Sequence, residues 1–190
     1  MGYKVPVGVS NKHLHLSQAD LEVLFGAGHQ LTVKNMLKQP GQYAAEEKVD
    51  IVGPKTTLKG IRVLGPVRKQ TQVELALTDA RQLGVAVPVR ESGKLEGSAS
   101  VKLVGPCGEV ELAEGAIAAL RHIHLTADQA KEAGVVDKQM VSVKVLGERG
   151  LVFDNVLIRS GEGHTAEFHV DTDEANAAGL GNNAEVEILL

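Results

Sequence analysis

Apolar residues along the chain fall in short runs rich in valine, isoleucine and leucine, which glycine, proline or charged residues separate. Such runs are typical of β-strands, whose side chains alternate between two faces. We expect strands at residues 5–9, 31–35, 48–52, 57–63, 72–77, 99–104, 140–146, 151–158, 166–170 and 184–189. The pattern therefore predicts a mainly β protein.

Helical patterns are few and short. Four segments join a hydroxyl or acidic residue to alanine-containing sequence and end at a glycine. The polar side chain can accept hydrogen bonds from the first helical turn, and glycine allows the left-handed residue that ends a helix. We expect helices of about two turns that begin at Ser17, Thr78, Thr126 and Asp173 and end at Gly26, Gly84, Gly134 and Gly179.

The two halves of the chain repeat one another. The string Asn11-Lys12-His13-Leu14-His15-Leu16-Ser17 mirrors Leu120-Arg121-His122-Ile123-His124-Leu125-Thr126. Aligning Gly84 with Gly179 places Glu74 opposite His169. This internal repeat predicts two similar β modules. We expect a first half at 1–90, a junction with an extra strand at 91–113, and a second half at 114–190.

The repeat suggests a metal centre, because each His-x-His string presents two imidazoles on one face of a strand. Each half supplies three candidate ligands, and three protein ligands with an open position are usual in catalytic zinc sites. The candidates are His13, His15 and Glu74 in the first half, and His122, His124 and His169 in the second. Two such half-sites facing each other could hold a metal pair roughly 4 Å apart. The alternative, packing or surface histidines, is weakened by the duplication.

Two further histidines have simpler interpretations. His29 follows a Gly-Ala-Gly turn and is expected to be a loop residue. His164 lies in Gly161-Glu162-Gly163-His164, where a loop role is the first interpretation and a place lining the metal site is the alternative.

Composition narrows the function further. The 190 residues are 43% hydrophobic but only 3% aromatic, so the core must be aliphatic. A net charge of −4 without a basic run argues against a nucleic-acid partner. The single cysteine, Cys107, cannot form an intrachain disulfide, fits a reducing compartment, and is expected to be an inert turn residue. No apolar stretch approaches the ~20 residues of a membrane span, and no signal peptide is recognised, so we expect a cytoplasmic protein.

Two arginines suggest an anion site. Arg62 and Arg68 bracket Leu64-Gly65-Pro66-Val67 just before the Glu74 strand, and a guanidinium matches phosphate geometry. Taken in isolation, either arginine is better interpreted as a solvated surface residue. Ser10 and Asn176, next to the expected ligands, read as turn and cap residues.

Several strings together resemble the PduL-type phosphotransacylases (phosphate propanoyltransferases), in order and over nearly the whole chain. They are Val7-Gly8-Val9-Ser10-Asn11-Lys12-His13-Leu14-His15-Leu16, Ile61-Arg62-Val63-Leu64-Gly65-Pro66 with Arg68 and Glu74, Arg121-His122-Ile123-His124-Leu125, and His169-Val170-Asp171-Thr172-Asp173-Glu174-Ala175-Asn176.

The resemblance implies two similar β-barrel domains capped by short helices, with two divalent ions, usually zinc, at their interface. It implies that His13, His15 and Glu74 hold one ion and that His122, His124 and His169 hold the other. It further implies that Arg68 takes the phosphate. Contacts to coenzyme A are implied for Ser10, Arg62, Leu64 and Asn176.

The expected reaction is reversible transfer of an acyl group from acyl-CoA to phosphate by direct attack, with propanoyl-CoA as the family substrate and acetyl-CoA as an alternative. The competing functions are a dinuclear metal hydrolase and a non-catalytic metal-binding module. Members from propanediol microcompartments carry an extra N-terminal segment, whereas the match here begins almost at Met1. The chain is therefore expected in the cytoplasm, or in a microcompartment lumen if such a segment has been trimmed. A homodimer through strand edges is left open.

Overall fold

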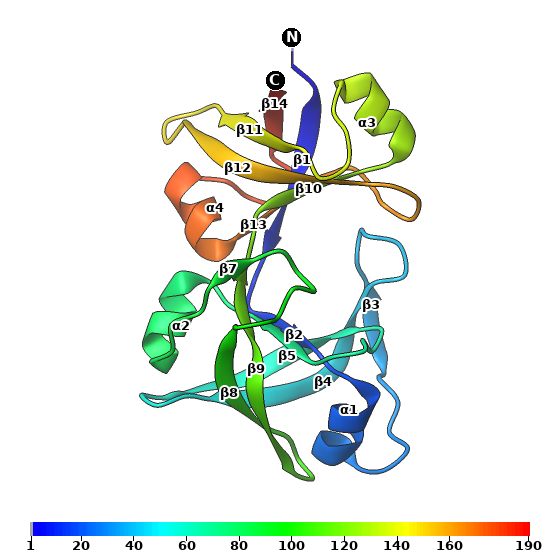
Figure 1. Ribbon diagram of the computed structural model, residues 1–190, viewed down its shortest axis with the longest axis vertical. Coiled ribbons are helices and arrows are strands. Elements are labelled where there is room, and N and C mark those ends of the chain that lie inside the picture. Colours follow the sequence, from blue (N-terminus) through cyan, green and yellow to red (C-terminus); the bar gives the residue numbers. More distant parts are fainter. Residues whose placement is uncertain (1) are drawn as a thin grey trace. The chain divides into compact units, whose positions relative to one another are not determined.

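The computed structural model describes residues 2–190, which form two compact units. The middle barrel consists of Lys12–Ala119, and the terminal barrel joins the residues up to Asn11 to Leu120–Leu190. Strands dominate both units (Figure 1), which confirms the expected mainly β fold with short helices. Within residues 2–190, no helix is long and apolar enough to cross a membrane.

The middle barrel is closed by six strands in the order β4-β5-β2-β6-β9-β8, because β8 pairs with both β9 and β4. Two more strands, β3 on β4 and β7 on β9, extend the sheet. The strands and helices of this unit are β2 (His13–His15), α1 (Gln18–Phe25), β3 (Val33–Met36), β4 (Tyr43–Val52), β5 (Thr57–Gly65), β6 (Gln72–Glu74), α2 (Leu77–Leu83), β7 (Val89–Arg90), β8 (Ala99–Val104) and β9 (Glu109–Ala119).

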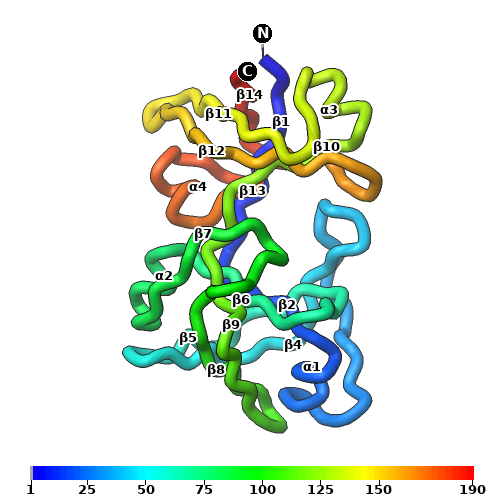
Figure 2. The backbone as a smooth tube through the Cα atoms, in the orientation of Figure 1, coloured from blue at the N-terminus to red at the C-terminus, as the bar shows by residue number. Residues whose placement is uncertain are grey.

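The terminal barrel is closed by six strands in the order β1-β13-β10-β12-β11-β14. Figure 2 shows how it brings the two ends of the chain together, with β1 antiparallel to β14. Its elements are β1 (Lys4–Ser10), β10 (His122–Leu125), α3 (Ala127–Ala133), β11 (Met140–Val145), β12 (Leu151–Ser160), β13 (Glu167–Asp171), α4 (Thr172–Ala178) and β14 (Glu185–Leu189). The expected pair of similar barrels is therefore confirmed.

In each barrel, one strand continues along the chain into the His-x-His strand of the other barrel. Strand β1 pairs in parallel with β13 in the terminal barrel and then leads into β2 of the middle barrel. Strand β9 likewise pairs in parallel with β6 and then leads into β10 of the terminal barrel. The compact units therefore divide the chain differently from the expected boundaries at 1–90, 91–113 and 114–190. The segment 91–113 supplies β8 and the start of β9, both strands of the middle barrel.

Strand β9 crosses the expected boundary between the junction at 91–113 and the second half, where no strand was expected. Among the described residues it is the longest strand, with 11 residues, but its sequence is acidic and rich in alanine, which lowers β propensity. It forms because it has partners on both sides, β6 and β8. Strand β6, in contrast, stops at Glu74 and not at the expected residue 77, since α2 already begins at Leu77.

Three of the four helices begin at a polar cap. Ser17 and Thr126 accept hydrogen bonds from the backbone N–H groups of Asp20 and Gln129, as expected. For α4 the cap is Asp171 and not Asp173, because the capping box pairs Asp171 with Glu174. The expected cap Thr78 is also wrong: α2 starts after Ala76, which offers no side-chain cap. Gly26, Gly84, Gly134 and Gly179 end the helices as expected.

A buried carboxylate fixes the loop after α1. His29 is a loop residue, and its Nε2 atom lies 3.0 Å from Oε1 of Glu47 on β4, which also accepts from the backbone N–H of Thr32. Burial alone would raise the pKa of Glu47, but these hydrogen bonds outweigh it and hold the pKa below its ordinary value. The ionised carboxylate therefore stabilises the fold.

We predict that Glu47→Gln lowers the free energy of unfolding by about 1–3 kcal/mol at pH 7, because it removes hydrogen bonds to a charged acceptor. A lowered folded-state pKa gives stability that is present above the unfolded-state pKa and lost as the pH falls through the folded-state pKa. The difference between wild type and variant should therefore shrink below about pH 4. Urea unfolding at pH 7 and pH 3.5 tests this, and a constant difference would contradict it.

Candidate metal centres

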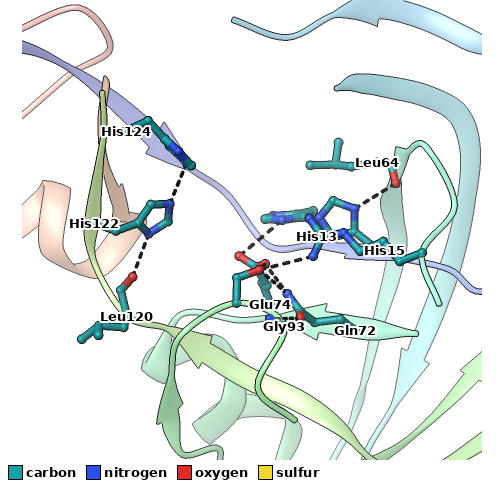
Figure 3. A network of polar contacts seen from close by, with 11 residues as sticks. His13, His15, Leu64, Gln72, Glu74, Gly93, Leu120, His122 and His124 are labelled. Carbon is teal, nitrogen blue, oxygen red and sulfur yellow. Dashed lines mark hydrogen bonds and ion pairs between the residues drawn. The ribbon is translucent and has the colours of Figure 1, made fainter. Parts of the chain in front are cut away.

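The first candidate centre lies within the middle barrel, on two adjacent strands. His13 and His15 are on β2, and the antiparallel register places Glu74 of β6 directly opposite His13. One donor atom from each of the three lies within 4.8 Å of the others, and Nε2 of His13 is 3.5 Å from Oε2 of Glu74 (Figure 3). We call this group the first triad.

The second candidate centre repeats the arrangement within the terminal barrel. His122 and His124 are on β10, and His169 of β13 lies opposite His122. The Nε2 atoms of His122 and His124 are 3.0 Å apart, and a donor atom of His169 completes a group within 4.8 Å (Figure 3). We call this group the second triad. It places His169 where the first triad has Glu74, as the repeat predicted.

The core of each barrel explains why these side chains face one another. Leu14, between His13 and His15, is fully buried in the core of the middle barrel, and Ile123 is equally buried in that of the terminal barrel. Side chains alternate along a strand, so burying the middle residue turns both histidines to the opposite face. Val73 and Phe168, beside Glu74 and His169, do the same on the partner strands.

The donors fit a divalent metal ion. Ligands around a tetrahedral zinc ion with bonds of ~2.0–2.1 Å lie about 3.3 Å from one another. The donor distances of 3.0 Å and 3.5 Å lie on either side of that value. Imidazole and carboxylate donors without thiolate suit zinc and neighbouring transition metals. Each triad could therefore hold one ion.

Burial keeps two of the ligand histidines in the form that binds metal. Desolvation, followed by the charges of His13 and Arg68, lowers the pKa of His15 to about 3. Desolvation and the neighbouring His122 and His169 lower the pKa of His124 to about 2. Both rings are neutral at physiological pH, which leaves a lone pair for an ion.

The carboxyl of Glu74 is ionised in spite of its burial, because its neighbours favour the charged form. Burial would raise its pKa, but His13, His15 and a hydrogen bond from Ser92 hold the pKa well below its usual range. The ionised carboxylate contributes one negative charge to the first triad. That charge favours a divalent cation.

Backbone carbonyls orient two of the rings. Nδ1 of His15 donates to the carbonyl of Leu64 at 3.1 Å, and Nδ1 of His122 donates to the carbonyl of Leu120 at 2.8 Å (Figure 3). A hydrogen bond of this kind fixes the tautomer and makes Nε2 the nitrogen that can bind a metal. His124 differs, since its Nδ1 atom lies 2.9 Å from Nδ1 of His164. His164, expected mainly as a loop residue, therefore contacts the second triad.

Arg68 is linked to the first triad through Ser92. The guanidinium donates to Oγ of Ser92 at 3.3 Å, and that hydroxyl donates to Oε1 of Glu74 at 3.0 Å. Gln72 donates to the same hydroxyl at 2.8 Å and accepts from the backbone N–H of Gly93. Neither Ser92 nor Gln72 was among the residues expected at the site. Gln72 had a signal, because it lies two residues before Glu74 on the same strand face, whereas the segment of Ser92 carried no motif.

A repeated ion pair anchors each His-x-His strand. Lys12 precedes His13 and binds Asp79 of α2 at 2.8 Å. Arg121 precedes His122 and binds Glu174 of α4 at 2.8 Å. Asp79 and Glu174 lie five residues before the equivalent glycines Gly84 and Gly179. The two ion pairs therefore occupy equivalent positions in the internal repeat.

The remaining expected site residues are divided between the units. In the middle barrel, Arg62 on β5 donates to the carbonyl of Ala45 on β4. In the terminal barrel, Ser10 ends β1 opposite Asp171, and Asn176 is exposed on α4. Cys107 is exposed in the turn between β8 and β9, as expected for a turn residue.

Comparison with known proteins gives one consistent family. The family model described as Phosphate propanoyltransferase matches residues 6–181. A phosphate propanoyltransferase of Thermotoga maritima is 55% identical over 184 residues, covering 96% of this chain and 88% of its own length. Those of Rhodobacter capsulatus (50% identical, 97% and 86% covered) and Salmonella typhimurium (52%, 94% and 85%) are similar.

We predict that the two triads lose their ions separately, because each lies within one barrel. His13→Ala and His122→Ala should each reduce the metal content of the purified protein from two ions per chain to one, measured by elemental analysis. The combined variant should hold none. His29→Ala removes a histidine outside both triads and is the control, which should keep both ions. Full metal content in the combined variant would contradict both assignments.

Proposed function

The chain belongs to the phosphate propanoyltransferase family, and we propose that it transfers a propanoyl group from coenzyme A to inorganic phosphate. Family membership supports the substrate class, and the two triads support a metal-assisted reaction. The observation that carries the proposal is the chain of contacts from Arg68 through Ser92 to Glu74, which ties an anion-binding group to a candidate metal ligand.

We propose direct attack by phosphate. An oxygen of phosphate forms a bond to the carbonyl carbon of the thioester, the carbon–sulfur bond breaks, and coenzyme A leaves as its thiolate to give an acyl phosphate. The reverse reaction follows the same course. The bound ions would supply Lewis acidity that stabilises negative charge on the carbonyl oxygen or the departing sulfur.

Arg68 is proposed to hold the phosphate. Its backbone N–H donates to the carbonyl of Leu16 at 2.8 Å, which fixes the start of the side chain, and Ser92 accepts from its guanidinium. A guanidinium so positioned can pair with two phosphate oxygens and reduce the entropy cost of bringing anion and thioester together.

A covalent acyl-enzyme is not needed for this reaction. The one cysteine, Cys107, is exposed in a turn, and no histidine that could activate it as a nucleophile lies near it in the sequence. The buried histidines that could act as a base instead form the triads. Phosphate is itself an adequate nucleophile once it is aligned.

Ser10, Arg62, Leu64 and Asn176 are proposed to contact coenzyme A, as the family resemblance implies. Leu64 would then serve twice, since its carbonyl already orients His15. Sharing of one substrate by both triads, the use of acetyl-CoA, and a homodimer stay predictions, as do the cytoplasmic or microcompartment location and the identity of the ions as zinc.

We predict that release of free thiol from propanoyl-CoA depends on phosphate. The thiol signal should rise with phosphate concentration, stop after removal of metal by a chelator, and return when Zn²⁺ is added back. Release that proceeds equally without phosphate would instead indicate a hydrolase. No release under any of these conditions, from protein that binds metal, would indicate a binding module.

We predict that Arg68→Ala raises KM for phosphate and lowers kcat on the order of 100-fold or more, the usual effect of losing a preorganised charge-stabilising donor. The KM for propanoyl-CoA and the metal content should change little. Lys69→Ala, which removes the adjacent exposed cation, is the matched control. Equal kinetics for the two variants would overturn the role of Arg68.

A further inference from the structure

We propose that Glu167 is a positioning residue of the second triad, which holds the imidazole of His169 in place. The inference rests on the proposed metal sites and adds a residue outside the six candidate ligands. Three independent observations support it: a direct contact, an exchange of residues between the repeats, and a space made for the side chain.

The contact is short and buried. Oε2 of Glu167 accepts a hydrogen bond from Nε2 of His169 at 2.6 Å, and the carboxylate side chain is only 10% exposed. Both residues lie on β13 two positions apart, so they share a face, while Phe168 between them is buried in the core. The backbone register also places Glu167 opposite His124. Glu167 therefore lies beside two of the three candidate ligands.

Glu167 acts through His169 and is not itself gathered with the donors. Among the described residues, the atoms within 4.8 Å of one another at this site come from His122, His124 and His169. A carboxylate that accepts from one ring nitrogen of a histidine makes the other nitrogen a better metal ligand and fixes the orientation of the ring. With Nε2 of His169 bound to Glu167, Nδ1 is the nitrogen that remains for an ion.

The two ligand strands carry their carboxylates in exchanged positions. Strand β6 reads Gln72-Val73-Glu74, and β13 reads Glu167-Phe168-His169. Gln72 lies opposite His15 just as Glu167 lies opposite His124. Three neutral imidazoles would leave the full charge of a divalent ion uncompensated in a largely buried site, which is costly. Glu167 places a carboxylate beside the second triad, as Glu74 does within the first.

Strand β1 leaves room for this carboxylate. Gly8 is the neighbour of His169 on β1, and a Cβ atom at Gly8 would lie 2.7 Å from Cδ and 2.9 Å from Oε1 of Glu167. These are closer than real Cβ contacts, so any side chain at Gly8 would displace the carboxylate. The equivalent neighbour of Glu74 is Ile117, a large residue. The space is thus particular to the second triad.

The experiment measures the second site alone. His13→Ala disables the first triad, so the remaining ion reports on the second. The zinc affinity of this variant, measured by competition with a chromophoric chelator, is compared with that of the same protein carrying Glu167→Gln, which installs the residue found in the first repeat. We expect zinc affinity to fall 10- to 100-fold. Adding Glu185→Gln instead removes an exposed carboxylate from β14 of the same barrel, and should leave the affinity unchanged.

A second variant and a stability measurement separate positioning from folding. Gly8→Ala, also in the His13→Ala protein, should weaken zinc binding in the same direction because it crowds Glu167. Thermal unfolding of the metal-free proteins should change far less than the zinc affinity. Unchanged affinity in both variants would overturn the inference while leaving the metal sites intact, as would a loss of metal-free stability without a loss of affinity. Absence of any bound ion in the His13→Ala protein would overturn the second metal site together with the inference.

Discussion

The alternation of side chains along four short strands is the constraint on which both candidate sites depend. Each barrel holds a His-x-His strand next to a second ligand strand, and the middle residue of every one is buried in the core. Rotating or shifting a strand by one residue would move two polar side chains into the apolar core and take an apolar residue out of it, at a cost of several kcal/mol. The hydrophobic core of each barrel therefore orients the ligand side chains, and no flexible loop is needed to bring the six candidate ligands into place.

Duplication accounts for the likeness of the two triads, and divergence for their differences. The segments from Leu64 to Gln72 and from Arg159 to Glu167 are equally long and join equivalent strands, so Arg68 occupies the position of Gly163 in the other repeat. The contact from a guanidinium through Ser92 to Glu74 belongs to the first triad. The second triad has His164 and Glu167 around it. The two triads therefore differ in the side chains that surround them.

The least local feature of the fold is the placement of β1 in the terminal barrel and of β9 in the middle barrel. Each pairs in parallel with the strand that carries the third ligand of a triad, and each then leads into the His-x-His strand of the other barrel. The terminal barrel could not close without β1, which precedes the histidines of the middle barrel. The middle barrel likewise could not close without β9, which precedes the histidines of the terminal barrel. The expected division into consecutive halves follows sequence order, whereas parallel pairing joins segments that are far apart in the chain.

The sequence by itself determined the strand-rich class, the duplication, all four helix starts to within two residues, and the equivalence of Glu74 and His169. These rest on local periodicity, cap chemistry and repeat spacing, which a single chain displays directly. Only the tertiary structure decided the rest. It made β9 a strand despite its acidic and alanine-rich sequence, and it placed β9 in the middle barrel and β1 in the terminal barrel. It also brought four further side chains to the triads, those of Ser92, Gln72, His164 and Glu167. A serine or glutamate without a motif gains a role only from its neighbours in space, and those neighbours are chosen by the pairing of strands far apart in the sequence.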